Sequence, residues 1–160
     1  MSEPLDAGRA RQALLSRAAL GVFKLNGQFL TVAEELAAPA GLTAAWWQVL
    51  GAVLPEPLPV AGVARAMGIT RQSVQRVADL LVERGLAVYL PNPAHRRAKL
   101  LAPTEAGRAA NASISPQHRA FADRLAGAYD SDAELAEAVA ALERLSQVLT
   151  ALSDPPVTEP

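Results

Sequence analysis

Apolar side chains recur along residues 8–38 at alternating steps of three and four positions. This spacing predicts one long helix that carries a single apolar stripe. A helix of this length cannot bury its stripe against itself, and the sequence "APAGLT" ends it with Pro39 and Gly41. The stripe consists of Leu15, Ala18, Val22, Leu25, Phe29, Val32 and Leu36.

A second stripe of the same kind lies near the C-terminus. The sequence "SDAE" at 131–134 is typical of a capping box at the start of a helix. Two stripes without a partner would expose a large apolar patch, so residues 1–40 and 109–152 are predicted to be dimerisation helices, and residues 153–160 a flexible tail. The second stripe consists of Leu135, Ala138, Leu142, Leu145, Leu149 and Leu152.

Shorter periodic segments occupy the middle of the chain. Thr43 can cap a helix over "AAWWQVLGAVL", which the Pro-rich linker "PEPLP" ends. A short helix is expected over about 60–67. A turn of about three residues containing Gly68 leads to a second helix, capped by Thr70 and ended by Gly85. This is helix-turn-helix spacing. The second helix has an inner stripe of Val74, Val77, Ala78 and Leu81.

A β-hairpin is predicted directly after these helices. "LAVYL" at 86–90 and "RAKLLA" at 97–102 have strand character, and "PNPAHR" between them is a turn cluster that brings Arg96 and Arg97 to the tip. Thr104 can cap another helix, which Pro116 interrupts or kinks. The expected fold is mostly α with a small β-hairpin wing: a winged helix-turn-helix core at 41–108 flanked by long dimerisation helices.

Charge is distributed unevenly along the chain although its net value is only -1. Residues 62–108 contain eight Lys and Arg against three Asp and Glu, a net charge of +5. Residues 109–160 contain three against eight, which gives -5, and residues 1–61 carry -1. A basic middle segment indicates a module whose surface faces a polyanion, and the neutral and acidic flanks would form a separate scaffold that holds this module.

The second helix of a helix-turn-helix enters the DNA major groove with its first turns. Gln can bind adenine and Arg can bind guanine in bidentate fashion, whereas Ser and helix N-terminal amides suit phosphates. An Arg at the tip of a wing suits the narrow minor groove. The residues predicted to contact double-stranded DNA are Thr70, Arg71, Gln72, Ser73, Gln75, Arg76, Arg96 and Arg97.

Three segments resemble the MarR family of bacterial transcriptional regulators: "LTAAWWQVL", "VARAMGITRQSVQRVADLLVERGLA" and "HRRAKLLAPTEAG". The resemblance covers about residues 42–108. It implies an obligate homodimer on a pseudo-palindromic operator, a recognition helix over Arg71 to Arg76, Arg97 as the wing arginine, and Trp47 in the core. Three positions depart from the family pattern: His95 replaces the usual wing Asp, Pro103 precedes Thr104 where Leu is usual, and Ala61 stands where a Ser or Asp cap is usual.

The resemblance also implies a small-molecule effector. Members of the family usually bind phenolic or other lipophilic anions in a crevice between the dimer helices and the DNA-binding lobe. In this chain the crevice is expected near Phe23, Trp46 and His118. A repressor released from DNA by a small aromatic or lipophilic ligand is the function that the resemblance favours.

Other classes of function have little support in the sequence. The chain has no Cys, which excludes disulfides and thiolate chemistry. No motif of a nucleophile, phosphate loop, metal site or carboxylate pair indicates an enzyme or a cofactor. His95 and His118 are interpreted as surface residues. Without a signal peptide or a membrane-spanning run, a cytoplasmic protein is expected. The alternative is a winged helix that serves as a protein-interaction module.

Overall fold

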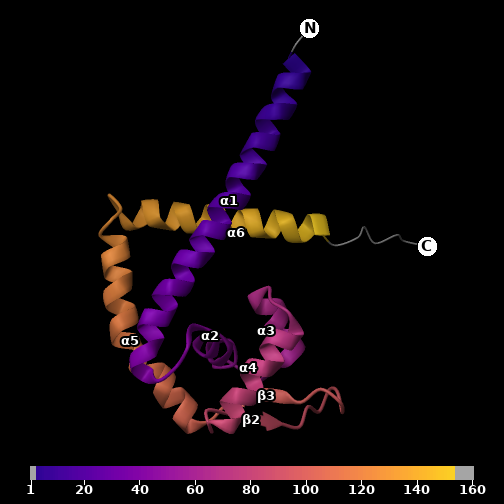
Figure 1. Ribbon diagram of the computed structural model, residues 1–160, viewed down its shortest axis with the longest axis vertical. Helices are drawn as coiled ribbons and strands as arrows, with labels where there is room; N and C mark the ends of the chain where they lie inside the picture. The colour runs from indigo at the N-terminus through magenta and orange to yellow at the C-terminus, as the bar shows by residue number, and fades with distance from the viewer. Residues whose placement is uncertain (1–2, 154–160) are drawn as a thin grey trace, which may run out of the picture. The chain divides into compact units, whose positions relative to one another are not determined.

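The computed structural model describes residues 3–153 and confirms a mostly helical fold with a small antiparallel sheet (Figure 1). The chain forms two compact units that meet between Ser115 and Pro116, and each is described by itself. The elements that begin in the first unit are α1 (Glu3–Ala37), the 3-10 turn η1 (Ala38–Ala40), α2 (Ala44–Ala52), β1 (Leu58–Pro59), α3 (Val60–Met67), α4 (Arg71–Glu83), β2 (Ala87–Leu90), β3 (Leu100–Pro103) and α5 (Glu105–Ala126).

Helix α1 ends at Ala37, close to the predicted position, and Gly41 ends the 3-10 turn η1 that follows it. Gly41 adopts φ +72°, a left-handed conformation that glycine accepts without a steric penalty, and its N–H donates to the Ala38 carbonyl at 3.0 Å. The Glu34 carboxylate of α1 then accepts a hydrogen bond of 2.7 Å from the first N–H of α2, that of Ala44. Thr43 caps the same helix end by accepting from the Trp46 N–H. The last turn of α1 is thereby joined to α2.

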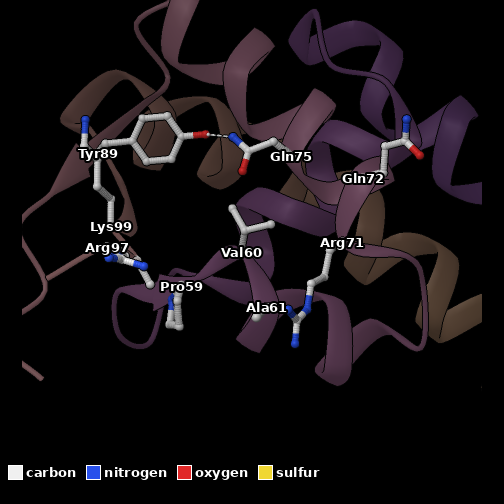
Figure 2. A pocket seen from close by; sticks show the side chains of 10 residues that line it. Pro59, Val60, Ala61, Arg71, Gln72, Gln75, Tyr89, Arg97 and Lys99 are labelled. Carbon is white, nitrogen blue, oxygen red and sulfur yellow. Dashed lines mark hydrogen bonds between the residues drawn. The ribbon is translucent and has the colours of Figure 1, made fainter. Parts of the chain in front are cut away.

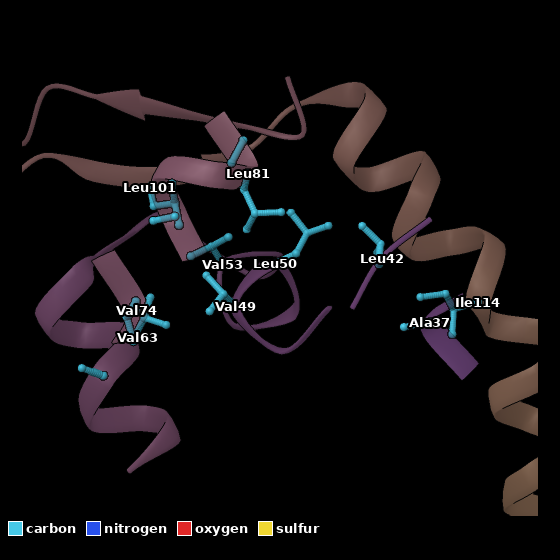
Figure 3. Packing of buried hydrophobic residues seen from close by; sticks show 13 residues of the cluster. Ala37, Leu42, Val49, Leu50, Val53, Val63, Val74, Leu81, Leu101 and Ile114 are labelled. Atoms are coloured by element: carbon cyan, nitrogen blue, oxygen red, sulfur yellow. The ribbon is translucent and has the colours of Figure 1, made fainter. Parts of the chain in front are cut away.

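Helix α2 and its C-cap residue Val53 provide the centre of the hydrophobic core. Figure 3 shows Val49, Leu50 and Val53 in the middle of the cluster, with Leu101 of β3 on one side and Leu42 on the other. Burying a side chain of this size contributes about 1.5–3 kcal/mol, so this cluster is what holds the short elements together. The fully buried larger side chains are Val49, Leu50, Val53, Val63, Val74, Leu81, Leu101 and Ile114.

The sheet differs from the predicted hairpin in two respects. Its strand order is β1-β3-β2, because Leu58 and Pro59 pair with Leu101 and Leu100 as a third, edge strand. The Pro-rich linker predicted there is therefore partly a strand, since an edge position tolerates a proline that cannot donate to a ladder. In addition, β3 begins at Leu100 rather than at residue 97, because consecutive turns occupy the residues before it.

Helix α5 begins tightly against Gly85 and Leu86, the two residues that precede β2. Thr104 caps it as predicted: its hydroxyl accepts from the Gly107 N–H at 3.1 Å and donates to the Gly85 carbonyl at 2.7 Å. A Cβ atom at Gly107 would collide with the Leu86 carbonyl oxygen, so the close approach requires glycine. Pro116 does not interrupt the helix, which continues to Ala126.

The second unit contains the rest of α5 and helix α6 (Asp132–Ser153). The predicted capping box is present: the Ser131 hydroxyl accepts from the Glu134 N–H at 3.2 Å, and the Glu134 carboxylate accepts from the Asp130 N–H at 2.9 Å. No residue of α6 is buried. Of the predicted flexible tail, Ser153 is the last residue of α6, and 154–160 lie outside the described residues.

Candidate nucleic-acid interface

The turn between α3 and α4 is closed by backbone hydrogen bonds. Gly68 adopts φ +64° and its N–H donates to Arg65, while the Ile69 N–H donates to the Ala64 carbonyl at 3.1 Å. The Thr70 hydroxyl oxygen then accepts from the Ser73 N–H at 3.1 Å, and the two hydroxyls lie 2.8 Å apart. Thr70 and Ser73, both predicted DNA contacts, therefore also fix the start of α4.

Helix α4 has one buried face and one exposed polar face. Val74, Ala78 and Leu81 are buried at the predicted spacing. The predicted contacts of the first two turns lie on the other side, where all are exposed to solvent. They are Arg71, Gln72, Ser73, Gln75 and Arg76.

A groove of about 580 Å³ lies between the start of α3, the start of α4 and the wing (Figure 2). Arg71 and Gln72 line it from the recognition helix, and Arg97 and Lys99 line it from the wing. No Asp or Glu is among its lining residues within the described part of the chain. The groove therefore carries positive charge and amide groups together, which suits an anionic polymer that also presents hydrogen-bonding edges.

Hydrogen bonds link three side chains beside the groove, two from α4 and one from β2. Gln75 Nε2 donates to Asp79 Oδ1 at 2.9 Å and to the Tyr89 hydroxyl at 2.8 Å. The Tyr89 hydroxyl in turn donates to Asp79 Oδ1 at 2.7 Å. We call this closed set of Gln75, Asp79 and Tyr89 the clamp, because it ties strand β2 of the wing to the middle of α4.

The clamp also affects the ionisation of Tyr89. Partial burial, followed by the hydrogen bond to Asp79 and the charge of that carboxylate, raises the pKa of Tyr89 to about 12. A phenol is protonated at neutral pH in any case, and the raised pKa keeps Tyr89 a donor to Asp79 at higher pH as well. Lys99 lies over the Tyr89 ring, with its ammonium 5.9 Å from the ring centroid.

The two arginines of the wing, Arg96 and Arg97, line different surface pockets. Arg97 lines the groove beside α4, whereas Arg96 lines a separate hollow of about 570 Å³ with Tyr89 and Lys99. Both follow a tight turn in which the His95 N–H donates to the Asn92 carbonyl at 3.2 Å. The structure thus brings Arg97 close to the predicted contacts of α4 and directs Arg96 to another face of the wing.

The three residues predicted for an effector crevice belong to different parts of the chain. Phe23 lies on α1 with 72% of its surface exposed. Trp46 of α2 is half-buried and carries the Arg84 guanidinium 5.2 Å from its ring centroid. His118 belongs to the second unit. A shared pocket of these residues stays a prediction. Trp47 packs against the core, as expected, and donates to Asn111 Oδ1 at 3.0 Å.

Sequence reasoning missed Tyr89, Asp79 and Lys99 as parts of this surface. One signal was available, because Gln75 and Asp79 are four residues apart on a helix and such pairs lie side by side. The contribution of Tyr89 could not be read from the chain, because it depends on how the wing folds back on α4. Among the described residues, no group of three or more His, Asp and Glu could hold a metal ion, and no helix is long and apolar enough to cross a membrane.

Comparison with known sequences identifies a family and a similar relative. Residues 40–98, from the end of the 3-10 turn to the wing, match the model of the MarR family. The chain is also 42% identical, over 116 residues, to an uncharacterised protein of Mycobacterium tuberculosis strain H37Rv. That similarity covers 72% of this chain and 81% of the relative.

Solved structures show the same similarity in three dimensions. A MarR-family transcriptional regulator from Rhodococcus sp. RHA1 is 27% identical, with a TM-score of 0.71 over 84% of this chain and 95% of that chain. CouR from Rhodococcus jostii RHA1, solved with p-coumaroyl-CoA bound, is 25% identical, with a TM-score of 0.66 over 92% of this chain and 99% of that chain.

Proposed function

Because this chain belongs to the MarR family of winged helix-turn-helix transcriptional regulators, we propose that it is a homodimeric repressor that binds a pseudo-palindromic operator. The groove between α4 and the wing carries the proposal. Three cations line it together with the amide of Gln72: Arg71 of α4, and Arg97 and Lys99 of the wing.

The side chains of the groove and of the exposed face of α4 divide into two roles. The three cations neutralise phosphates and supply affinity that depends on salt. Gln72 and Arg76 project from the exposed face of the recognition helix, where Gln can pair with adenine and Arg with guanine. Arg97 follows the duplex toward the minor groove. The cations thus set how tightly the protein binds, and the helix sets which sequence it prefers.

The exposed apolar stripes of α1 and α6 support the homodimer. Leu15 of α1 and Leu149 of α6 are 65% and 50% exposed in the single chain, and both belong to the predicted stripes. A second copy would cover such stripes. Two recognition helices in a symmetric dimer would enter successive major grooves about 34 Å apart, which is why the operator is expected to be pseudo-palindromic.

We further propose that a small aromatic or lipophilic ligand releases the repressor from DNA. CouR, which has this fold, was solved with an aromatic acyl thioester bound. A ligand shifts DNA affinity only when it binds one spacing of the two recognition helices better than the other. Titration of salicylate-like acids, followed by Trp fluorescence and DNA affinity together, tests this. Quenching of Trp46 and Trp47 without a change in affinity would contradict the coupling.

The experiment for DNA binding uses fluorescence anisotropy with duplexes from around the protein's own gene, over a series of salt concentrations. We expect Arg97→Ala to weaken binding to all sequences and to reduce the salt slope by about one unit. Gln72→Ala should instead reduce the preference for the operator over a scrambled duplex, by about 1–3 kcal/mol. Arg119→Ala, in the second unit, is the matched control for loss of one positive charge.

The protein-interaction alternative predicts a different result. A folded, dimeric chain that binds operator and scrambled duplexes with equal affinity at low salt would contradict sequence-specific DNA binding and favour the alternative. A transcriptional reporter under the identified operator distinguishes repression from activation.

A further inference from the structure

An acidic side chain stands on the face of α4 that is proposed to meet DNA. Asp79 is exposed and lines a pocket along this helix together with Gln75 and Arg76. A carboxylate only accepts hydrogen bonds, and its charge repels the phosphates of a duplex. By its charge alone, Asp79 would therefore weaken DNA binding. Its contacts indicate a different role, because its Oδ1 atom accepts a hydrogen bond of 2.7 Å from the Tyr89 hydroxyl.

Tyr89 lies close to the point where the wing leaves the sheet. It is the next-to-last residue of β2, just before the turns that lead to Arg97. Side chains alternate along a strand, so Tyr89 shares a face of β2 with Ala87, which is buried in the core. Ala87 attaches the inner end of β2 to the core, and the hydrogen bond from Tyr89 to Asp79 attaches the outer end to the middle of α4.

The cations of the wing lie next to this attachment. The Lys99 ammonium is 5.9 Å from the centroid of the Tyr89 ring, and Arg97 lines the same groove. Figure 2 shows Tyr89, Lys99 and Arg97 on one side of the groove and Arg71 on the other side. The direction in which the outer end of β2 leaves the core therefore sets the distance between the cations of the wing and those of α4.

We propose that Tyr89 and Asp79 are positioning residues for DNA binding: their hydrogen bond holds the wing at the distance from α4 at which Arg97 and Lys99 reach the same duplex as Arg71. Neither Tyr89 nor Asp79 needs to touch the DNA. This role rests on the proposed function, and extends it from the groups that bind DNA to two groups that hold them in place.

Such an attachment raises affinity without a contact to the ligand. A segment that is ordered before binding loses less conformational entropy when the complex forms. A wing attached only at its core end would have to be ordered by the DNA itself, and this would offset part of the gain from each phosphate contact. The charge of Asp79 acts in the opposite direction, because it repels phosphates. Asp79 therefore contributes as an acceptor of hydrogen bonds and not through its charge.

The first test compares two substitutions of Asp79. Asp79→Asn and Asp79→Ala both remove the negative charge, but only asparagine keeps an oxygen that can accept from Tyr89. Fluorescence anisotropy measures DNA affinity, and circular dichroism confirms that each variant is folded. Asp79→Asn should bind DNA at least as tightly as the wild type, and Asp79→Ala should bind about 3-fold or more weakly than Asp79→Asn. Equal affinities of the two variants would mean that Asp79 acts only through its charge, and would overturn the inference.

The second test asks whether Tyr89 acts through the wing. Tyr89→Phe keeps the ring beside Lys99 and removes only the hydroxyl, so it should weaken DNA binding at low salt by about 3-fold or more. The loss should vanish when Arg97→Ala and Lys99→Ala have already removed the cations of the wing. It should persist in the matched control, in which Arg71→Ala and Arg76→Ala remove two cations from α4 instead.

The two backgrounds separate a positioning role from a general effect on stability. If Tyr89→Phe weakens binding by the same factor in both, it acts on the whole domain and the inference is wrong. A Tyr89→Phe variant that binds as tightly as the wild type also overturns it, although the proposed function stands. If the wild type itself binds no duplex, the proposed function fails.

Discussion

The winged helix and the long helices contain the same types of apolar residue, but these residues are buried in the first region and exposed in the second. In the winged helix, Leu81 of α4 and Leu101 of β3 are fully buried within a single chain. In α6, Leu142 and Leu149 follow an equally regular pattern, yet no residue of that helix is buried. Regular spacing therefore predicts which face of a helix is apolar, but whether that face is covered depends on what packs against it. One region buries its apolar face within the chain, and the other leaves its apolar face exposed in the single chain.

The largest expected effect is on the core of the winged helix. Leu81→Ala should lower the free energy of unfolding by about 2–5 kcal/mol, because it leaves a cavity in a fully packed cluster. Leu152→Ala is the matched control on α6, where the side chain is 77% exposed. Urea unfolding at low protein concentration measures both. Equal losses for the two variants would contradict the contrast between the regions.

Substitutions in the apolar stripe of α6 should change the dimerisation affinity rather than the free energy of unfolding. Leu149→Glu places a charge on the face proposed to be covered by a second copy, so dimerisation should weaken by about 100-fold or more, because an unpaired buried charge is costly. Gln147→Glu adds the same charge to an exposed position of the same helix outside the stripe. Analytical ultracentrifugation distinguishes them. A wild-type protein that sediments as a 16.8 kDa monomer at micromolar concentration would refute the homodimer.

A smaller effect is expected where α5 meets Leu86, the residue that precedes β2. Gly107→Ala should destabilise the protein by about 1–3 kcal/mol, because the added methyl group meets the Leu86 carbonyl oxygen and backbone must move. Gly51→Ala in α2 is the control, since nothing lies within 4 Å of its Cβ position and alanine favours a helix. Thermal unfolding of the two variants should therefore shift in opposite directions. A destabilised Gly51→Ala with an unchanged Gly107→Ala would contradict this.

The smallest expected effect is the pH dependence that Tyr89 introduces. Burial and the bond to Asp79 raise its pKa to about 12, above the ordinary value of 10.0, so the folded state holds the proton more tightly than the unfolded state. This contribution to stability is fully present below about pH 10 and is lost as the pH rises toward 12. Urea unfolding at pH 9 and pH 11 should show a steeper loss for the wild type than for Tyr89→Phe. Parallel losses would mean that the clamp does not form in solution.

Much of the fold followed from the sequence because local interactions decide it. The predicted bounds of α3 are those observed, and Thr70 and Thr104 cap the helices that they were predicted to cap. Glycines with positive φ end the segments at positions 41, 68 and 85. Caps, left-handed glycines and apolar periodicity all act within a few residues, so a single chain shows them.

What only the tertiary structure decided are the contacts between distant segments. Strand β1 exists because β3 offers it an edge, and two residues are too few to show a period of their own. The sequence predicted Gln75 as a DNA contact from its place on the helix, but its amide nitrogen also donates to Asp79 and to Tyr89, which lies 14 residues further on. Residue type and helical position fix which groups a side chain can present. Only the folding of the wing against α4 decides which of those groups remain available, because a hydrogen bond made within the protein is no longer open to a ligand.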